Sequence, residues 1–410
     1  MNIKKRNRPS GVFYKPANDI NVFKINPKNG EIEHYNGDEV SVVTYEEYEK
    51  LIDFKNQTVV LKCKNNEDIK TVFDEFRNRA DLLIKETKGY VNLYKYLSIR
   101  TASFEFFRQM SKNLVEPEEI SDIEGIFLDR AFRGGHHFHE DYEGFGISYD
   151  LNSMYLHFMS GLGFTAPFSK GEFKTYTQQE FSELKFYPYG IYRCKVTESN
   201  KFFTPSKSNH YTHFDLQLLK ELNIKATIIE DNQANCMIYE KNRVNGNKMF
   251  SNFKDYFYPL KKKGLPVKDI ISRLWGAFCT KNIKKSRGRA GHKVELNTPG
   301  DYIESIHMEG DTTVVEHGNV NDIFLNNYAR IGVFLTSYCR LKFIRLCMPH
   351  EKYIVRINTD SMLTTIDISD KLEIGKELGM FKIENRGHCK VFSSKYVEFY
   401  DLDNNVIKKN

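Results

Sequence analysis

Two apolar runs, each ending close to an aspartate, decide the fold class of this chain. They are Phe145–Asp150 (FGISYD) and Lys352–Ile357 (KYIVRI), the second followed by Asn358-Thr359-Asp360-Ser361 and then Met362–Ile368 (MLTTIDI). Both runs are rich in β-branched and aromatic residues and predict strands. The polar residues between the last two runs predict the tip of a β-hairpin. Asp150 and Asp360 are therefore expected at strand tips.

Carboxylates at strand tips indicate a specific chemistry. A strand tip is rigid, so Asp150 and Asp360 can share a pair of divalent ions. Mg²⁺ takes oxygen ligands, commonly one or two carboxylates plus substrate phosphates. Two such ions stabilise both the attacking and the leaving oxygen of a phosphoryl transfer. A single Asp at a strand end is more often a turn former, so the prediction rests on the two residues together.

The sequence around these runs predicts an α+β fold. Helical spacing covers residues 67–112 and recurs near 214–222, at Asp269–Phe278 and at Asn326–Cys347. Residues 1–60 carry short alternating runs and turn signals, Thr58–Leu61 indicates a strand, and residues 185–240 alternate in a strand-like way. The acidic stretch Glu116–Glu124 is expected to be a surface connector. We place a domain boundary near 115–125.

Five elements resemble the motifs of family B DNA polymerases of the protein-primed phage and linear-plasmid branch. Their order along the chain is that of the family, and the last element consists of two segments. Tyr149–Tyr155 is similar to the motif D-x-x-S-L-Y-P, and Arg356–Ser361 to Y-x-D-T-D-S. Lys268–Gly276 resembles K-x-x-x-N-S-x-Y-G, and Ala131–Gly135 resembles the Y-R-G-G element. Leu378–Lys382 and Ser394-Lys395-Tyr396 resemble the end of the palm with its K-x-Y motif. The resemblance covers roughly residues 126–400.

This resemblance implies a domain plan. It implies a family B palm with helical fingers over residues 126–410, with insertions at about 160–250 and 282–325. Residues 1–125 would form a small mixed N-terminal domain of unknown role. Asp122-Ile123-Glu124 superficially matches an exonuclease motif but lies too close to Asp150 for an exonuclease to follow, so no proofreading is expected. Few residues follow Tyr396, and the thumb is expected to be absent or vestigial.

The resemblance also implies a role for each site residue. Asp150 and Asp360 would be catalytic and would hold two Mg²⁺ or Mn²⁺ ions together with Leu151. The dNTP would contact Ser153, Met154, Tyr155, Lys268, Ser272, Trp275 and Gly276. Tyr155 would lie under the sugar and exclude a 2′-hydroxyl by bulk. DNA would contact Arg133, Gly134, Gly135, Thr359, Ser361, Lys395, Tyr396, Lys284, Lys285 and Arg287.

Two groups of residues can also be interpreted without the resemblance, from their spacing and charge alone. Lys268, Ser272 and Trp275 or Gly276 fall on one face of the predicted helix, where a lysine can supply charge to phosphates. A basic run of Lys281, Lys284, Lys285, Arg287, Arg289 and Lys293 predicts either a loop that tracks nucleic-acid phosphates or an ordinary solvated loop. For His136, His137, His139 and Glu140 we expect template contact or plain surface, because their spacing matches no standard zinc motif.

Composition sets the outer limits. The 410 residues have a net charge of +6, which permits an anionic partner without demanding one. No uncharged apolar stretch is long enough for a membrane helix, and the basic N-terminus is not followed by an apolar signal region. Seven scattered cysteines predict reduced thiols and an intracellular location, in the cytoplasm of the host cell. The resemblance implies the partners: a DNA template-primer, a terminal protein as primer, and a protein that supplies the thumb or processivity function.

Departures from the motifs keep three hypotheses open. Asn358 replaces an acid, Leu156 a proline, Ser272 and Arg273 the Asn-Ser pair, and Trp275 a tyrosine. The first hypothesis is a template-directed DNA polymerase that extends a 3′-hydroxyl or a protein primer. The second is a catalytically weak or inactive polymerase-like subunit that binds nucleic acid or a terminal protein. The third is a template-independent nucleotidyltransferase.

Overall fold

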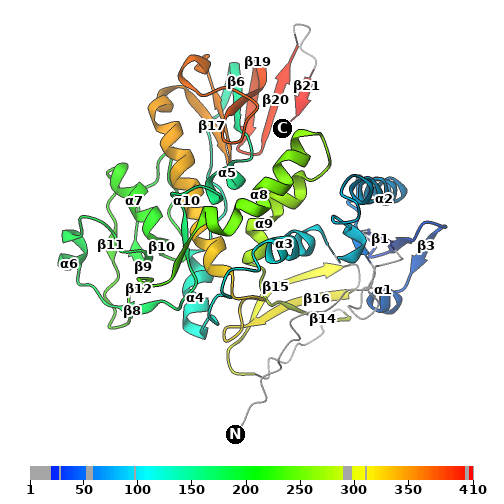
Figure 1. Cartoon of the computed structure of the whole chain (residues 1–410), viewed down its shortest axis with the longest axis horizontal. Coiled ribbons are helices and arrows are strands. Elements are labelled where there is room, and N and C mark those ends of the chain that lie inside the picture. Colours follow the sequence, from blue (N-terminus) through cyan, green and yellow to red (C-terminus); the bar gives the residue numbers. More distant parts are fainter. Residues whose placement is uncertain are drawn as a thin grey trace.

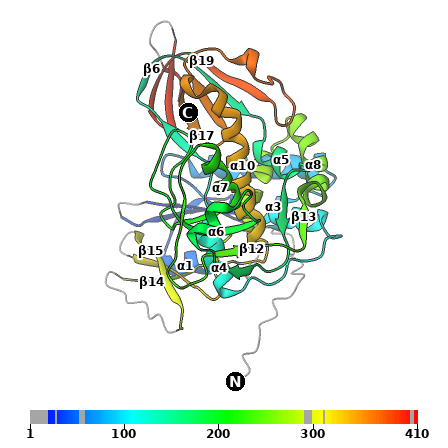
Figure 2. The same cartoon turned by 90° about the vertical axis from the view of Figure 1, so that its left-hand side faces the viewer.

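The computed structural model describes residues 20–26, 29–51, 59–96, 98–289, 298–309, 312–401 and 406–409. These residues form an α+β fold with several separate sheets (Figures 1 and 2). Among them, no helix has the length and apolar character needed to cross a bilayer. All seven cysteines are free and buried, as their scattered spacing predicts.

A small sheet with its helices forms the N-terminal part. Its strands lie in the order β3-β2-β1-β4, with β1 antiparallel to β2 and parallel to β4. The elements are β1 (Ile20–Ile25), β2 (Ile32–Tyr35), β3 (Val40–Val43), α1 (Tyr45–Leu51), β4 (Val59–Lys62), α2 (Ile69–Glu86), η2 (Leu93–Lys95) and α3 (Ile99–Met110). Within the described residues, short strands before residue 60 and helices over 67–112 are present as predicted, whereas helix α1 was not predicted. Residues 1–19, 27, 28 and 52–58 lie outside the described residues.

Helix α2 shows how local sequence sets these elements. Asp68 is its N-cap, and the Asp68 side chain accepts a hydrogen bond from the backbone N–H of Thr71. Ile69, Phe73 and Phe76 lie on the buried face at helical spacing, and Ala80 and Leu83 extend that face.

The largest sheet has seven strands in the order β21-β20-β19-β6-β18-β17-β5. It consists of β5 (His137–His139), β6 (Tyr142–Leu151), β17 (Ile354–Asn358), β18 (Ser361–Thr364), β19 (Phe381–Ser393), β20 (Tyr396–Tyr400) and β21 (Val406–Lys409). The predicted strand before Asp150 and the predicted hairpin around Asn358–Ser361 are both confirmed. In β6, Ile147, Tyr149 and Leu151 enter the main core, so the alternating residues Ser148 and Asp150 face the other side of the sheet.

Helix α10 (Ala329–Cys347) shares that main core and runs through the middle of the molecule (Figure 1). It begins three residues later than predicted. Arg330 lies fully inside and binds both carboxylate oxygens of Glu124, with Nε–Oε1 at 2.6 Å and Nη2–Oε2 at 2.7 Å. The prediction that Glu116–Glu124 is a surface connector is therefore wrong at its end, because Glu124 belongs to helix α4 (Asp122–Ala131) and neutralises a buried arginine.

Residues 154–245 add a five-stranded sheet, a two-stranded sheet and three short helices. In the larger sheet the order is β10-β9-β12-β8, and β11 also pairs with β9; β7 pairs with β13. The elements are α5 (Met154–Met159), β7 (Thr165–Pro167), β8 (Glu172–Lys174), α6 (Gln178–Glu183), β9 (Gly190–Lys195), β10 (His210–Thr212), α7 (His213–Glu221), β11 (Thr227–Ile228), β12 (Cys236–Ile238) and β13 (Arg243–Asn245). Helix α7 confirms the helix predicted near 214–222.

The next two elements along the chain, after residue 245, are helices. They are α8 (Gly246–Lys262) and α9 (Lys268–Phe278), and α9 confirms the predicted helix. Helix α3 packs directly against α9, where Ser103 Oγ donates to the Ile270 carbonyl at 2.5 Å. In addition, Arg79 of α2 forms an ion pair with Asp269 at 2.9 Å. The boundary predicted near 115–125 lies between α3 and α4, and both of these helices contribute residues to one core.

The basic run beginning at Lys281 contains a strand. β14 (Lys284–Arg289) pairs with β16 (Thr312–Asn319), which pairs with β15 (Asp301–Glu309). The prediction of a loop is therefore wrong for Lys284, Lys285 and Arg287, because their backbone groups form ladder hydrogen bonds. Lys293 lies outside the described residues. The remaining described elements are η3 (Met348–Tyr353) and η4 (Ser369–Lys371).

Candidate functional site

The structure brings the two predicted aspartates together. Asp150 is near the end of β6, and Asp360 lies in the turn between β17 and β18. Ser361 is the register partner of Asp150, and the Leu151 N–H donates to the Asp360 carbonyl at 2.8 Å. Residues far apart in the sequence therefore meet at one end of the seven-stranded sheet.

The backbone beside both aspartates is strained. Thr359 has φ +60° and Ser153 has φ +53°, both in the left-handed region. For a β-branched residue such as Thr359 this conformation is a genuine outlier and persists only when the surroundings enforce it. Here the Thr359 N–H donates to the His136 carbonyl at 2.9 Å. Strain of this kind clusters at functional sites.

The environment shifts both carboxyl pKa values upward. Burial raises the pKa of Asp150, and the neighbouring Lys382 opposes this shift. Burial and the charge of Asp150 raise the pKa of Asp360 to about 7. Two carboxylates that repel each other in a partly buried cleft favour a cation between them.

Both aspartates line a cavity of about 120 Å³. Seven of its lining residues are site residues predicted from the sequence: Asp150, Ser153, Met154, Tyr155, Lys268, Ser272 and Asp360. Six are not among the predicted site residues: Asn152, Leu156, Lys261, Ile271, Lys382 and Glu384. Leu151 lies next to the cavity but its side chain is buried in the core.

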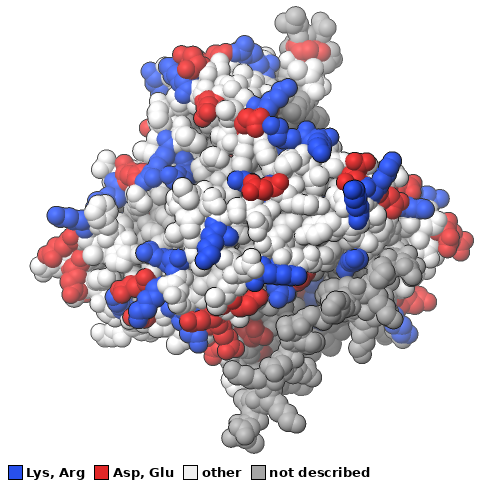
Figure 3. Space-filling view, in the orientation of Figure 1, with Lys and Arg blue, Asp and Glu red and all other residues white. Residues whose placement is uncertain are grey.

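Lys261 is the first of the functional candidates that sequence reasoning missed. Its Nζ donates to Asn152 Oδ1 at 3.0 Å and to Ser153 Oγ at 2.5 Å. Burial lowers the pKa of Lys261, and so do the charges of Lys382 and Lys268. Lys and Arg side chains gather over the end of α8, where Lys261 and Lys262 occupy the last turn (Figure 3). The Lys261-Lys262-Lys263 triplet was the available signal in the sequence.

Lys382 and Glu384 of β19 also lie at the aspartates. Lys382 is the register partner of Asp150, and its Nζ lies 3.1 Å from Asp150 Oδ1 and 3.0 Å from Glu384 Oε1. A register shift between Ile383 and Asn385 accompanies this arrangement. Lys382 is the last residue of the Leu378–Lys382 segment that resembles the end of the palm, but nothing in the local sequence indicates its contact with Asp150.

Tyr155 lines the cavity and Trp275 packs behind it, whereas Trp275 and Gly276 are not among the lining residues. The rings of Tyr155 and Trp275 stack with centroids 5.2 Å apart and an angle of 16°. The Tyr155 hydroxyl is buried without a hydrogen-bond partner among the described residues. Beyond Trp275, a Cβ at Gly276 would meet no described atom within 4 Å, so space is open there. The predicted nucleotide-facing residues of α5 and α9 are thus neighbours.

The Arg133–Gly135 turn is held from inside the molecule. Arg340 of α10 donates through Nη1 to the carbonyls of Arg133 and Gly134, both at 2.7 Å, and through Nη2 to Asp215 Oδ1 at 2.8 Å. The Arg133 side chain donates to the Thr204 carbonyl at 2.5 Å and lies over the Phe203 ring. Sequence reasoning missed both members of the buried Arg340–Asp215 pair, which show no local pattern.

The histidine cluster is split by the fold. His136 is buried, its Nε2 lies 2.9 Å from the Lys201 carbonyl, and burial lowers its pKa to about 4. The expectation of a surface or template-contacting residue is wrong for His136, because it packs inside the turn. His137 and His139 are exposed on β5.

The predicted primer-binding residues lie in the turn after the end of β19 that pairs with Tyr142, and not after the end that pairs with Asp150. Lys395 and Tyr396 are exposed at the turn from β19 to β20. The Arg356 side chain donates through Nε to the Ser394 carbonyl at 2.8 Å, which ties this turn to β17. Burial lowers the pKa of His137, and the charge of Lys395 lowers it further, while a hydrogen bond with Asn358 raises it, so these groups are close together.

The basic residues of β14 do not line this cavity. Lys284 is exposed, and Lys285 forms an ion pair with Glu316 of the neighbouring strand. At the start of the run, Lys281 pairs with Asp129 at 3.0 Å and with Glu304 at 3.1 Å. Part of the positive charge predicted from the sequence is therefore neutralised within the protein.

The donor set suits hard divalent ions that arrive with a substrate. In the part of the chain that the structure describes, no three His, Cys, Asp or Glu side chains form a metal site by themselves. Asp150 and Asp360 provide carboxylate oxygens on a rigid edge, and Lys261 and Lys268 provide charge for an anion beside them. Mg²⁺ commonly binds through one or two carboxylates together with substrate phosphates. The residues therefore fit such ions.

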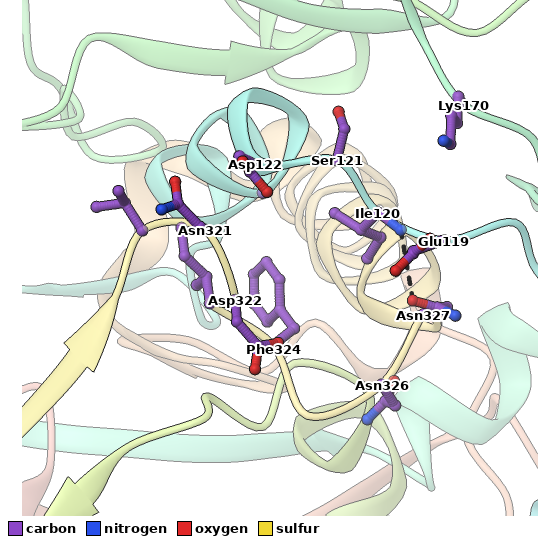
Figure 4. Close-up of a pocket in the computed structure, with 13 residues that line it drawn as sticks. Glu119, Ile120, Ser121, Asp122, Lys170, Asn321, Asp322, Phe324, Asn326 and Asn327 are labelled. Carbon is purple, nitrogen blue, oxygen red and sulfur yellow. Dashed lines mark hydrogen bonds between the residues drawn. The ribbon is translucent and has the colours of Figure 1, made fainter. Parts of the chain in front are cut away.

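A second cavity, of about 310 Å³, lies elsewhere, at the start of α4 (Figure 4). It is lined by Glu119, Asp122 and Asp322, with Lys170 at its rim, and the Ile120 N–H donates to Asn327 Oδ1 at 3.4 Å. None of the residues predicted as site residues lines it.

Two aspartates at one end of the largest sheet, together with lysines that line the same cavity, form the centre of the candidate site. The fold of this chain resembles that of Phi29 DNA polymerase, a protein-primed family B enzyme. With that enzyme bound to primer-template DNA, the TM-score is 0.57 at 14% identity, covering 95% of this chain and 89% of that one. With its complex with single-stranded DNA, the values are 0.56, 17%, 92% and 72%. With its complex with primer-template DNA and incoming nucleotides, they are 0.55, 16%, 93% and 74%.

Comparisons at the level of sequence find nothing. No protein-family profile matches the chain, and no curated protein matches it. At 14–17% identity the structural likeness establishes the fold alone, and it agrees with the polymerase-like fold expected from the motifs.

Proposed function

We propose that this chain is a template-directed DNA polymerase that transfers a dNMP unit to a hydroxyl primer by two-metal chemistry. The observation that carries the proposal is the Asp150–Asp360 pair beside the lysine-lined cavity. It is supported by a fold that resembles Phi29 DNA polymerase, whose structures hold primer-template DNA and nucleotides. The primer would be the 3′-hydroxyl of a strand or a hydroxyl of a terminal protein.

Each group in the cleft would have a defined task. Divalent ions, when bound, supply the charge that stabilises the attacking and leaving oxygens. Asp150 and Asp360, with the Leu151 carbonyl, would hold those ions. Lys261 and Lys268 would neutralise the triphosphate, which needs point charges at its outer phosphates.

The aromatic side of the cleft would select the nucleotide. Tyr155 would lie against the sugar and leave no room for a 2′-hydroxyl. Trp275 would stack on the base, and the open space at Gly276 would admit the base pair. The turn at Gly134 and Gly135 would approach template phosphates, while Lys395 and Tyr396 would hold the primer end. A protein that supplies the thumb or processivity function would be a further partner.

Primer extension tests this function directly. A short labelled template-primer is incubated with dNTPs and Mg²⁺ or Mn²⁺, using wild type and Asp360→Asn. We expect template-directed extension by the wild type and its loss in Asp360→Asn. Absence of extension in both metals, alone and with a terminal protein, would remove the proposal.

One observation favours the second candidate, a polymerase-like subunit without activity. Lys382 already neutralises Asp150, and Asn358 stands where the resembled motif has an acid. A protein of this kind would bind DNA without extending it. DNA binding by fluorescence anisotropy, together with the extension assay, separates the two candidates.

A further inference from the structure

The contact between Lys382 and Asp150 places a protein cation at the proposed metal site. The two residues face each other across β19 and β6, and the Lys382 ammonium lies between two carboxylates, at 3.1 Å from Asp150 Oδ1 and 3.0 Å from Glu384 Oε1. The Asp150 side chain is only 18% exposed, so little water screens this contact. The ammonium thus neutralises the oxygens that a divalent ion would use.

The charges around the cavity balance. Among its lining residues, the acids are Asp150, Asp360 and Glu384, and the cations are Lys261, Lys268 and Lys382. Three acids and three lysines give this lining a formal charge of zero, so the lining as a whole does not favour a metal ion over other solutes. An amide at position 358 adds nothing to the negative side. A bound nucleoside triphosphate would make the total charge in the cavity negative, because it brings several negative charges.

The three lysines of the cavity differ in what they contact. Lys382 forms its ion pairs with the cavity acids Asp150 and Glu384, whereas Lys261 donates to Asn152 and Ser153, which are neutral. Lys268 stands at the first position of α9, and its charge acts on Asp150 less strongly than the direct contact of Lys382. The Lys382 side chain is 46% exposed, and its flexible four-carbon stem can swing into solvent without disturbing the sheet.

We infer that Lys382 is a built-in competitor of divalent ions, which has to leave Asp150 before a metal ion can bind there. The inference rests on the proposed function, because it assumes that Asp150 and Asp360 hold the ions. It predicts weak metal binding to the protein alone and much tighter binding once a nucleotide draws the lysine toward its phosphates. Metal occupancy is thereby coupled to substrate.

The test measures Mn²⁺ binding to the full chain by electron paramagnetic resonance, without nucleotide or DNA. Lys382→Met keeps the stem and removes the charge, and we expect about tenfold tighter Mn²⁺ binding than in wild type. Lys382→Arg keeps the charge and should show no gain. Lys390→Met is the matched control: Lys390 also lies on β19, faces its register partner Glu143 on β6 at 2.7 Å and is 43% exposed, but lines no part of the cavity. It should bind as the wild type does.

The outcomes separate this inference from the proposed function. Equal Mn²⁺ binding by wild type and Lys382→Met, with Asp360→Asn abolishing it in both, overturns the competitor role and leaves the metal site intact. Mn²⁺ binding that Asp360→Asn does not affect overturns the metal site itself, and with it the proposed function. If Lys382→Met melts well below the wild type, Lys382→Gln replaces it in the same comparison.

Discussion

Gly135 and Thr359 are in contact across the β5–β17 end of the sheet. A Cβ placed on Gly135 would lie 2.6 Å from Thr359 Cγ2 and 2.7 Å from Thr359 Oγ1. Thr359 precedes Asp360 and has φ +60°. The glycine is therefore needed for the turn that carries Asp360, in addition to its expected place near template phosphates.

Gly135→Ala is expected to reduce primer extension about 10- to 100-fold, since a displacement of about 1 Å at a reacting group costs on this order. Steady-state extension rates check this. Gly125→Ala in α4 is the control, because its Cβ would lie 3.6 Å from the nearest atom, an ordinary contact, and alanine favours a helix. A wild-type rate in Gly135→Ala would show that the Thr359 turn adjusts freely.

Stability should fall as pH rises, through Asp360. The folded protein raises the pKa of Asp360 from 3.8 to about 7, so between these values it binds a proton that the unfolded chain has released. Stability rises with pH only where the unfolded state binds more protons. Here the folded state binds more, and the Asp360 contribution to stability is lost as pH rises from about 4 to about 7.

Urea unfolding in a chelator, at several pH values between 5 and 8, measures this effect. The free energy of unfolding of the wild type should fall relative to that of Asp360→Asn, by up to about 1.4 kcal/mol for each pH unit below pH 7. Added Mg²⁺ should remove the difference, because it favours the ionised carboxylate. Parallel pH profiles of the two proteins without metal would contradict the raised pKa of Asp360.

The buried pair Arg340–Asp215 should dominate the stability contributed by α10. Arg340→Met leaves Asp215 buried without this partner and releases the carbonyls of Arg133 and Gly134. We expect a loss of about 3–5 kcal/mol in the free energy of unfolding. Arg345→Met on the same helix is the control, because Arg345 and Glu221 are about one-third exposed and such pairs contribute less than about 1 kcal/mol. Equal losses would contradict this assignment.

Trp275 is the only tryptophan of the chain and stacks on Tyr155, which lines the cavity, so its fluorescence should report nucleotide binding. Titration with dNTP and Mg²⁺ should change the emission, because a base stacked on the indole alters its surroundings. The change should saturate in wild type, and the apparent affinity should weaken about tenfold or more in Lys268→Ala, which lacks a charge for the phosphates. An emission that nucleotide leaves unaltered would place the base elsewhere.

The sequence predicts the parts of this site that depend on short segments. Asp150 and Asp360 are recognisable because each follows a run of strand-forming residues, and Lys268 and Ser272 because helical spacing puts them on one face. Lys382 is not recognisable in this way, because its contact with Asp150 depends on the pairing of β19 with β6 across more than 200 residues. Arg340 and Asp215 escape prediction for the same reason.

Two predictions are wrong in segments that are rich in charged residues. Lys284–Arg289 alternates too little to be recognised as a strand, since its register partners on β16 supply the pairing. In the sequence, Glu124 resembles a surface residue. In the structure it is bonded to Arg330, about two hundred positions later, inside the protein. In the first case a run of charged residues forms a strand, and in the second case an acid expected at the surface is buried.

The packing of α3 against α9 has a consequence for how the chain is made. Ser103 and Ile270 are 167 positions apart, yet they share a buried hydrogen bond. During synthesis α3 leaves the ribosome long before α9 is made. The apolar face of α3 therefore stays exposed while the intervening chain is synthesised. Contacts at such separations slow folding. The nascent chain should therefore depend on chaperones, and a version shortened to residues 126–410 should aggregate instead of folding as a separate catalytic core.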